Sequence, residues 1–270
     1  MHYPKSLYII LISPFLLSHS NGKDKHTWAD FRGPSGDGIV ADCPRNLPTK
    51  WSEKENIVWK TEIKGRAWSS PVVWKEQVWV TNSTADGKSM GAYCINSQTG
   101  DIIYEFDLFQ NDSVEPLGNS VNSYGSPSPV IEKGTVYIHF GSYGTIAINT
   151  GTGKIIWKRT DLPCRHFRGP GSSPVLFEEL LILTMDGVDF QYLTALDKKT
   201  GKTIWKTDRS TKWDDIEPDG KIRGDGDLRK AYSTPTFTNV GEKTIMISPG
   251  AKSCFAYDPR DGKEIWNVTY

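Results

Sequence analysis

The hydrophobic positions along the chain form short runs rather than long stripes. Runs such as Val78-Trp79-Val80 and Val136-Tyr137-Ile138 are rich in β-branched and aromatic residues, which favour strands. No apolar stretch of helix length repeats with the period of an α-helix. Glycine, asparagine, aspartate and serine separate the runs, as is typical of strands joined by turns. The pattern therefore predicts an all-β protein.

One pattern of turn and aromatic residues occurs four times along the chain. An Asn or Asp begins each copy, a glycine follows it by four residues, and an aromatic residue follows it by eight. The copies begin at Asn96, Asn149, Asp197 and Asp258. The glycines are Gly100, Gly153, Gly201 and Gly262, and the aromatic residues are Tyr104, Trp157, Trp205 and Trp266. A Ser-Pro or Thr-Pro pair precedes each copy, so the chain contains four similar units.

Each unit predicts one four-stranded antiparallel sheet. The proline opens the first strand, where a missing N–H is tolerated, and the Asn or Asp closes a turn before the fourth strand. The units span about residues 69–107, 126–160, 171–207 and 232–270. So small a sheet cannot bury its faces alone, so the sheets are expected to stack as the blades of a β-propeller. The glycines and aromatic residues of the repeat are the expected docking contacts.

The eight-residue spacing resembles the tryptophan-docking motif of the pyrroloquinoline-quinone-like (quinoprotein or BamB-type) β-propeller repeat family. The run Trp28-Ala-Asp-Phe-Arg-Gly-Pro-Ser-Gly-Asp-Gly-Ile39, followed by Trp59 and Ser69-Ser70-Pro71, is similar to the exported bacterial branch of that family. The resemblance covers about residues 51–270. It implies a propeller of seven or eight blades.

The number of predicted strands does not close a ring. Residues 51–64 predict an outer strand without three strands of its own before it, whereas the fourth unit already has an outer strand. Because members of the resembled family have more blades, we expect an incomplete ring from a truncated sequence. The alternative is a four-bladed ring with a loose N-terminal strand.

The first 20 residues differ in character from the rest of the chain. Lys5 precedes an apolar run over residues 7–17, and Ser18-His19-Ser20 follows it. This order is typical of a cleaved signal peptide, and the run is too short to cross a bilayer as a helix. We therefore expect a signal peptide at 1–20, an N-terminal extension at 21–50 and a periplasmic or secreted protein without a membrane span. An apolar N-terminal strand is the alternative.

Charge and cysteine content narrow the classes of function. The 32 basic and 32 acidic residues balance, which argues against a nucleic-acid partner. The cysteines are Cys43, Cys94, Cys164 and Cys254, and their pairing stays open. Alcohol dehydrogenases of the resembled family carry adjacent cysteines and a Ca²⁺ ion held by Glu, Asn and Asp, and neither feature is recognised here. No catalytic residue, metal site or cofactor is therefore predicted, and PQQ with Ca²⁺ belongs only to the alternative function below.

The loops that enter the innermost strands are expected to meet at one mouth of the propeller. They carry the candidate binding residues Arg66, Trp68, Tyr124, Arg168 and Tyr232. Aromatic and cationic side chains around a concave mouth suit an anionic or sugar-like ligand. The alternative is that the aromatic residues pack between blades while the cations are solvated. An acidic insertion at 214–230 adds a long loop at this mouth.

The residues favour a non-enzymatic binding or scaffold protein that presents its loop face to a protein or glycan partner. Assembly-factor relatives within the resembled family work in this way. The alternative is a fragment of a PQQ-dependent quinoprotein dehydrogenase whose active-site residues lie elsewhere. A hydrolase or lyase built on the mouth loops is a third possibility.

Overall fold

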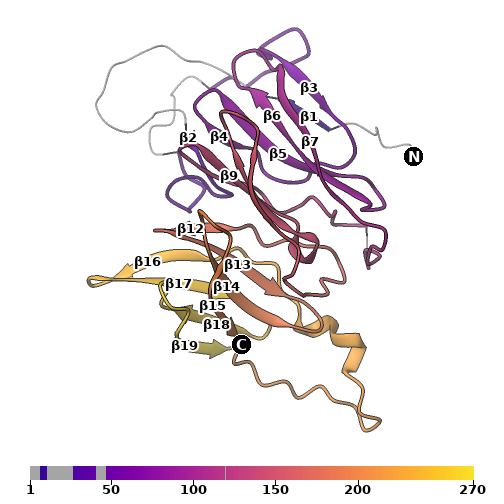
Figure 1. Cartoon of the computed structure of the whole chain (residues 1–270), viewed down its shortest axis with the longest axis vertical. Helices are drawn as coiled ribbons and strands as arrows, with labels where there is room; N and C mark the ends of the chain where they lie inside the picture. The colour runs from indigo at the N-terminus through magenta and orange to yellow at the C-terminus, as the bar shows by residue number, and fades with distance from the viewer. Residues whose placement is uncertain (1–6, 11–26, 41–46, 119) are drawn as a thin grey trace.

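The computed structural model describes residues 7–10, 27–40, 47–118 and 120–270 of the chain (Figure 1). Regular structure in these residues consists of strands and two short 3₁₀ segments, η1 (Gly141–Tyr143) and η2 (Arg223–Arg229). Cys43 lies outside the described residues. The prediction of an all-β protein is confirmed.

Four antiparallel sheets of consecutive strands form the blades. The strands of blade 1 are β4 (Val72–Trp74), β5 (Gln77–Ser83), β6 (Ser89–Asn96) and β7 (Ile102–Gln110). Those of blade 2 are β8 (Val130–Glu132), β9 (Thr135–His139), β10 (Thr145–Asn149) and β11 (Ile155–Arg159). Blade 3 contains β12 (Val175–Phe177), β13 (Leu180–Asp186), β14 (Gln191–Asp197) and β15 (Thr203–Asp208). Blade 4 contains β16 (Thr236–Val240), β17 (Lys243–Pro249), β18 (Ser253–Tyr257) and β19 (Glu264–Thr269).

The N-terminal part of the chain adds strands that the repeat pattern does not show. β2 (Thr27–Trp28) pairs with β4 and widens blade 1 to five strands. β3 (Lys60–Ile63) is the described strand within the outer strand expected at residues 51–64, and it pairs with β1 (Leu7–Ile10). Most of residues 1–20 lie outside the described residues. A signal peptide there therefore stays a prediction, although residues 7–10 form a strand.

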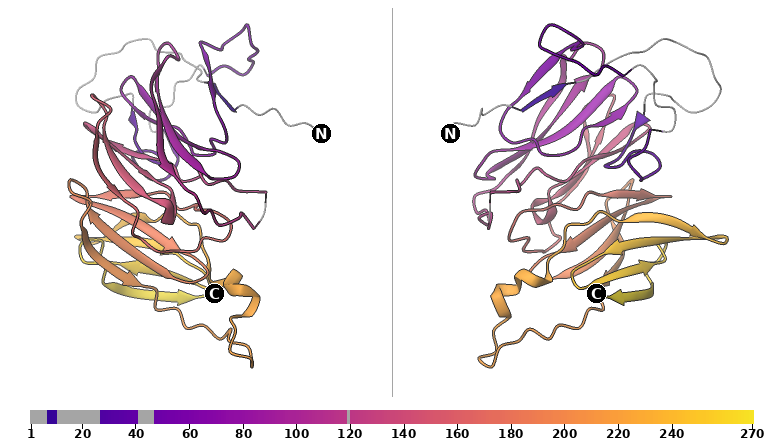
Figure 2. Two further views of the ribbon diagram at one scale, coloured as in Figure 1. Left: turned by 45° about the vertical axis from the view of Figure 1, so that its right-hand side comes forward. Right: turned by 180° about the vertical axis from the view of Figure 1, so that it is seen from behind.

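The hydrophobic core lies between the blades rather than within one sheet. Trp79 and Phe109 of blade 1 share a buried cluster with Ile138 and Ile146 of blade 2. Corresponding clusters join blade 2 to blade 3 and blade 3 to blade 4. The views in Figure 2 show the sheets following one another in an arc. Each blade therefore depends on its neighbour for burial, which is the property expected of a repeat architecture.

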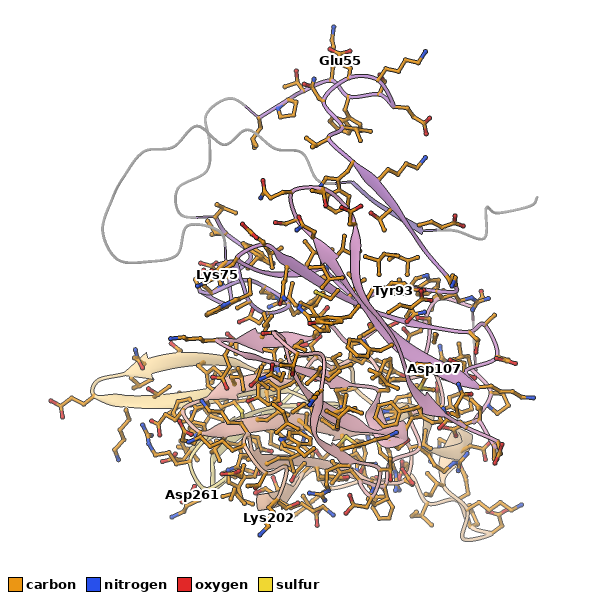
Figure 3. All side chains as sticks on the ribbon, turned by 45° about the horizontal axis from the view of Figure 1, so that its top comes forward. Glu55, Lys75, Tyr93, Asp107, Lys202 and Asp261 are labelled. Carbon is orange, nitrogen blue, oxygen red and sulfur yellow. The ribbon has the colours of Figure 1, made fainter. Side chains whose placement is uncertain are left out.

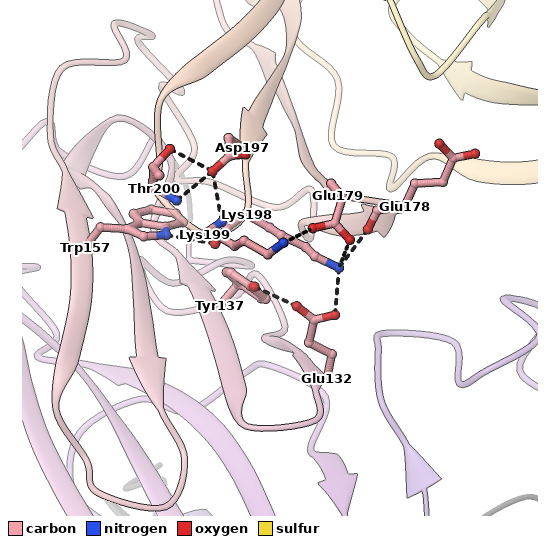
Figure 4. Close-up of polar contacts among 9 residues, drawn as sticks. All are labelled: Glu132, Tyr137, Trp157, Glu178, Glu179, Asp197, Lys198, Lys199 and Thr200. Carbon is pink, nitrogen blue, oxygen red and sulfur yellow. Dashed lines mark hydrogen bonds and ion pairs between the residues drawn. The ribbon is translucent and has the colours of Figure 1, made fainter.

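Repeated contacts between an aromatic residue and a glycine join successive blades. Trp157 lies so close to Gly201 that a Cβ atom there would stand 2.7 Å from the indole. The Trp157 indole N–H also donates to the Lys198 carbonyl at 2.9 Å (Figure 4). Tyr104 lies against Gly153 and Trp205 against Gly262 in the same way. The close approach explains why these turns carry glycine.

The first and last members of the docking series differ from the sequence-based expectation. Trp59, on the segment leading into β3, lies against Gly100 and donates to the Ser97 carbonyl at 2.9 Å. Trp266 on β19 exposes 41% of its surface, and none of the described glycines lies against it. No strand of blade 4 pairs with a described strand of blade 1. The described residues thus form an incomplete ring, and its last docking aromatic has no neighbouring blade among them.

Polar contacts strengthen the side of the stack that carries the short turns. Lys198 forms ion pairs with Glu132 at 3.0 Å and with Glu179 at 3.4 Å, which links blades 2 and 3 (Figure 4). In Figure 3, the turn residues Lys75, Lys202 and Asp261 lie along one side of the stack. This side therefore holds the repeated turns.

A buried ion pair at the end of blade 3 is also hydrogen-bonded to blade 4. Arg209 and Asp186 are nearly inaccessible, and their closest atoms are 2.7 Å apart. The guanidinium also donates to the Ser248 carbonyl at 3.1 Å and to the Ser248 hydroxyl at 3.0 Å. A buried guanidinium is stable only when its N–H groups find acceptors. The contacts of Arg209 with Asp186 and Ser248 therefore fix the path of the chain after β15.

Candidate functional site

Three long connections meet on the side of the stack opposite the short turns. They are the segments 111–129, 160–174 and 209–235, each joining the outer strand of one blade to the innermost strand of the next. They run along the right-hand side of Figure 1, and Figure 2 shows the same grouping from two further directions. We call this side the mouth face. Because strands alternate in direction, the β13–β14 turn at 187–190 also lies there.

Glu115 ties the first two connections together. Its carboxylate accepts from Arg165 Nε at 3.1 Å and from the backbone N–H of Phe167 at 2.9 Å. The hydroxyl of Tyr124 donates to the Glu115 carbonyl at 2.8 Å. Tyr124 is buried, its ring meets that of Tyr143 edge to face, and burial raises the pKa of its phenol. Tyr124 therefore packs the base of the mouth face instead of lining its surface.

Arg66 and Trp68 lie where the chain enters blade 1. The Arg66 backbone forms a two-way bridge with Ser83, at 2.8 and 3.0 Å. Trp68 exposes 45% of its surface. In the part of the chain that the structure describes, no hydrogen bond or ion pair joins either residue to Arg168 or Tyr232. The five candidates thus fall into separate places on the mouth face.

Arg168 and Tyr232 belong to a compact group of side chains that we call the Phe167 corner, made of Phe167, Arg168, Asp227, Lys230 and Tyr232. Arg168 Nη2 is 3.1 Å from Asp227 Oδ2. Lys230 forms an ion pair with Asp227 and donates to its carbonyl at 2.6 Å. Burial, together with the nearby Arg168 charge, lowers the pKa of Lys230 to about 8. The third connection therefore folds back onto the second.

The acidic insertion is held in shape by its own ion pair. The Arg229 guanidinium makes two hydrogen bonds to the Asp215 carboxylate, at 2.6 and 2.9 Å, and this pairing lowers the pKa of Asp215. Gly226 lies directly against the Val188 carbonyl of the β13–β14 turn. Asp215, Glu217 and Asp219 are thus paired with cations of the same loop. Sequence motifs alone do not reveal Glu115, Phe167 or Asp227, since they meet partners that are distant in the chain.

The buried cysteine and histidines of this region are electrically neutral. Cys164 Sγ lies 3.7 Å from His166 Nδ1. Burial raises the pKa of the Cys164 thiol well above its usual value and lowers the pKa of His166 to about 4. An activated cysteine needs the opposite shift. The pair therefore packs the mouth face and does not form a nucleophilic dyad.

A pocket lies at the innermost strands, and we call it the axial pocket. Its volume is about 440 Å³, within the range of small-molecule sites. Segment 27–36 forms one wall, and residues of β4, β8, β12 and β16 form the other. The backbone of this segment is anchored by a hydrogen bond from the Ile131 N–H to the Ala29 carbonyl at 2.9 Å. Burial raises the pKa of Asp30 in this wall.

The described residues do not fit the metal site of the quinone enzymes. Within the described ranges, no group of three or more His, Cys, Asp or Glu side chains could hold a metal ion. The described cysteines Cys94, Cys164 and Cys254 are free, and they belong to different parts of the stack. We therefore derive no reaction step through a quinone. Among the same residues, no helix has the length and hydropathy to span a membrane.

Four-stranded blades in an arc, with aromatic residues lying against the next blade, define the chain as a β-propeller protein of the PQQ-like repeat type. The family described as outer membrane protein assembly factor BamB matches residues 36–163 and 189–270, well over half of the sequence, so the chain belongs to this family. The family and the fold expected from the repeat are thereby confirmed. No curated protein matches the sequence.

Solved structures share the fold at low sequence identity. The quinohemoprotein alcohol dehydrogenase of Comamonas testosteroni is 20% identical, with a TM-score of 0.54, over 76% of this chain and 35% of the enzyme. BamB from Moraxella catarrhalis is 15% identical, with a TM-score of 0.54, over 80% of this chain and 56% of that protein. A europium-containing methanol dehydrogenase is also 15% identical, with a TM-score of 0.54, over 76% of this chain and 42% of the enzyme. The chain thus spans only about a third to just over half of these proteins.

Proposed function

We propose that the protein is an exported, non-enzymatic scaffold whose mouth face binds a protein partner. The observation that supports this most directly is the set of large apolar side chains exposed on that face. Exposed fractions are 45% for Trp68, 46% for Phe190, 57% for Ile216 and 56% for Leu228. Large apolar side chains that are exposed on one face of a rigid protein offer contact area to a partner.

Fixed loops favour binding because little freedom is left to lose. Glu115 fastens segment 160–174, Arg229 fastens the acidic insertion, and Arg209 fixes the exit from blade 3. A surface that is already ordered has a smaller entropic cost of association. The family match to an assembly factor and the likeness to BamB from Moraxella catarrhalis support the same class of function.

A photo-crosslinking experiment tests this proposal. A benzophenone amino acid replaces Phe190 on the mouth face or, as the control, Ile204 on β15, which exposes a similar fraction of its surface. We expect a discrete adduct from position 190 in envelope extracts of the producing cells, and loss of that adduct when Trp68→Asp and Leu228→Asp are added. Equal adducts from both positions, or an adduct unaffected by these changes, would contradict the proposal.

A quinoprotein dehydrogenase fragment is the competing function, and a titration separates the two. Pyrroloquinoline quinone is added to the protein with Ca²⁺ while absorbance and dye-linked alcohol oxidation are followed. A scaffold gives no saturable spectral change and no oxidation. Saturable binding with alcohol oxidation would replace the scaffold by the enzyme.

A further inference from the structure

The backbone at Phe167 is held in a conformation that a bulky side chain rarely adopts. Its φ angle is +60°, in the left-handed region. The backbone N–H of Phe167 donates to Glu115, and its carbonyl accepts from the Gly118 N–H at 2.8 Å. Strain of this kind persists only where surrounding contacts enforce it, and it gathers at functional sites. The contacts turn the Phe167 ring toward two cations.

Both cations lie close to the ring. Arg168 Cζ is 5.9 Å and Lys230 Nζ is 5.2 Å from its centroid. Asp227 is the carboxylate paired with them. Two positive charges against one negative charge leave the Phe167 corner with an excess of one positive charge.

Hydrogen-bonding groups in the same corner are left unused. The Arg168 Nε and the Tyr232 hydroxyl are buried, and neither has a hydrogen-bond partner. A buried donor without an acceptor is costly and calls for an explanation. The Arg168 side chain nevertheless exposes 38% of its surface, whereas Lys230 exposes 6%. An incoming acceptor can therefore reach the exposed part of the Arg168 side chain.

We propose that the Phe167 corner binds a carboxylate group of an acidic peptide segment in the partner protein. A carboxylate carries the single negative charge that balances the corner, and its planar pair of oxygens matches a guanidinium. Exposed Leu228 follows Asp227 directly and offers an apolar contact beside the charge. A peptide that places an acidic side chain next to an apolar one supplies both groups.

This inference rests on the proposed function and specifies the chemistry of its partner. The carboxylate can come from a side chain or from a chain end, and two probes distinguish these sources. The first is a capped peptide that alternates glutamate and leucine. The second is a glutamine–leucine peptide with a free C-terminus, and the fully capped glutamine–leucine peptide is the uncharged control.

Calorimetry of these peptides with the wild-type protein and three variants tests the inference. Arg168→Met should weaken carboxylate binding about tenfold or more. Lys221→Met removes a charge from an exposed side chain of the same insertion, paired with Asp219, and should change the affinity less than about twofold. Tyr232→Phe removes only the unpartnered hydroxyl. It should weaken binding about threefold or more without lowering the unfolding midpoint, because it removes a buried group that has no partner.

The dependence of binding on pH gives a separate measurement. Lys230 faces Asp227 of the insertion, Arg168 of segment 160–174 and the Phe167 ring. Burial raises the pKa of the neighbouring Tyr232 phenol, and Glu115 raises it further. Loss of the Lys230 proton above pH about 8 removes the excess positive charge. Affinity should therefore fall between pH 7 and pH 9, and Lys230→Arg should retain it.

The outcomes separate this inference from the scaffold proposal. Binding of either carboxylate probe, with loss in Arg168→Met and Tyr232→Phe, supports the inference. The inference is overturned if the capped glutamine–leucine peptide binds as tightly as the carboxylate probes, or if no probe binds. It is also overturned if Arg168→Met leaves the affinity for the carboxylate probes unchanged. If the inference fails but the crosslink at position 190 is still observed, the scaffold function is retained and its partner is recognised by a different chemistry.

Discussion

At the scale of single residues, the packing of two histidines lowers the pKa of each imidazole. His139 and His166 are almost completely buried. His139 Nδ1 lies 2.8 Å from Thr145 Oγ1, and His166 Nε2 accepts from the Ser142 N–H at 3.2 Å. Burial lowers the pKa of His139 to about 3 and that of His166 to about 4. Both rings are therefore neutral in the folded protein at neutral pH, as packing residues should be.

We predict that these histidines make the protein sensitive to mild acid. Their folded-state pKa values lie below those of the unfolded chain, so the unfolded state takes up more protons between pH 6.5 and 4. Stability should fall as the pH drops through this window, by about 2 kcal/mol per histidine at pH 5. Urea unfolding at pH 7 and pH 5 measures the loss. His139→Asn should reduce it by about half, and an unchanged loss in this variant would contradict the assignment.

At the scale of elements, the docking turns show what local sequence can predict. Each turn is encoded within nine residues, by an Asn or Asp, a glycine and an aromatic residue. The strands and the four blades were therefore predictable from the chain alone. β2 was not, because two residues carry no periodicity and its pairing with β4 bridges a long interval. The Phe167 corner was predicted only through Arg168 and Tyr232, since Asp227 meets them through the folding of a long loop.

We predict that replacing a docking glycine destabilises the protein more than the same replacement at a glycine with positive φ that contacts no aromatic residue. Gly201→Ala introduces a side chain at positive φ and also presses it into Trp157. The expected loss is about 3 kcal/mol, of which ~1–2 kcal/mol comes from the backbone conformation. Gly220→Ala is the matched control, because Gly220 also has positive φ but nothing lies within 4 Å of its added Cβ. Urea denaturation compares the two, and equal losses would show that the Trp157 contact is unimportant.

At the scale of the whole molecule, the stack is held together by interfaces, and these interfaces differ along the arc. Trp205 is buried between blades 3 and 4, and its indole N–H donates to the Pro259 carbonyl at 3.1 Å. Trp266 occupies the same place in the repeat but exposes 41% of its surface. The stabilising value of one motif thus depends on the blade that follows it.

We predict that this difference appears in the unfolding free energy of the chain. Trp205→Ala should destabilise by ~3–5 kcal/mol, because it opens a cavity between two blades. Trp266→Ala should cost ~1 kcal/mol or less, as is usual for exposed positions. Denaturation followed by far-ultraviolet circular dichroism, which reports mainly on the backbone, gives both values. Similar losses in the two variants would mean that Trp266 is buried in solution.

The position of segment 27–36 in the axial pocket has a consequence for the order of events during synthesis. A Cβ atom at Gly36 would stand 3.6 Å from the hydroxyl of Thr236, which is made 200 residues later. At a ribosomal rate of ~5–20 residues per second, this segment waits roughly ten seconds or longer for its final neighbour. Its seating against β16 therefore belongs to the last stage of maturation, after the earlier blades have formed.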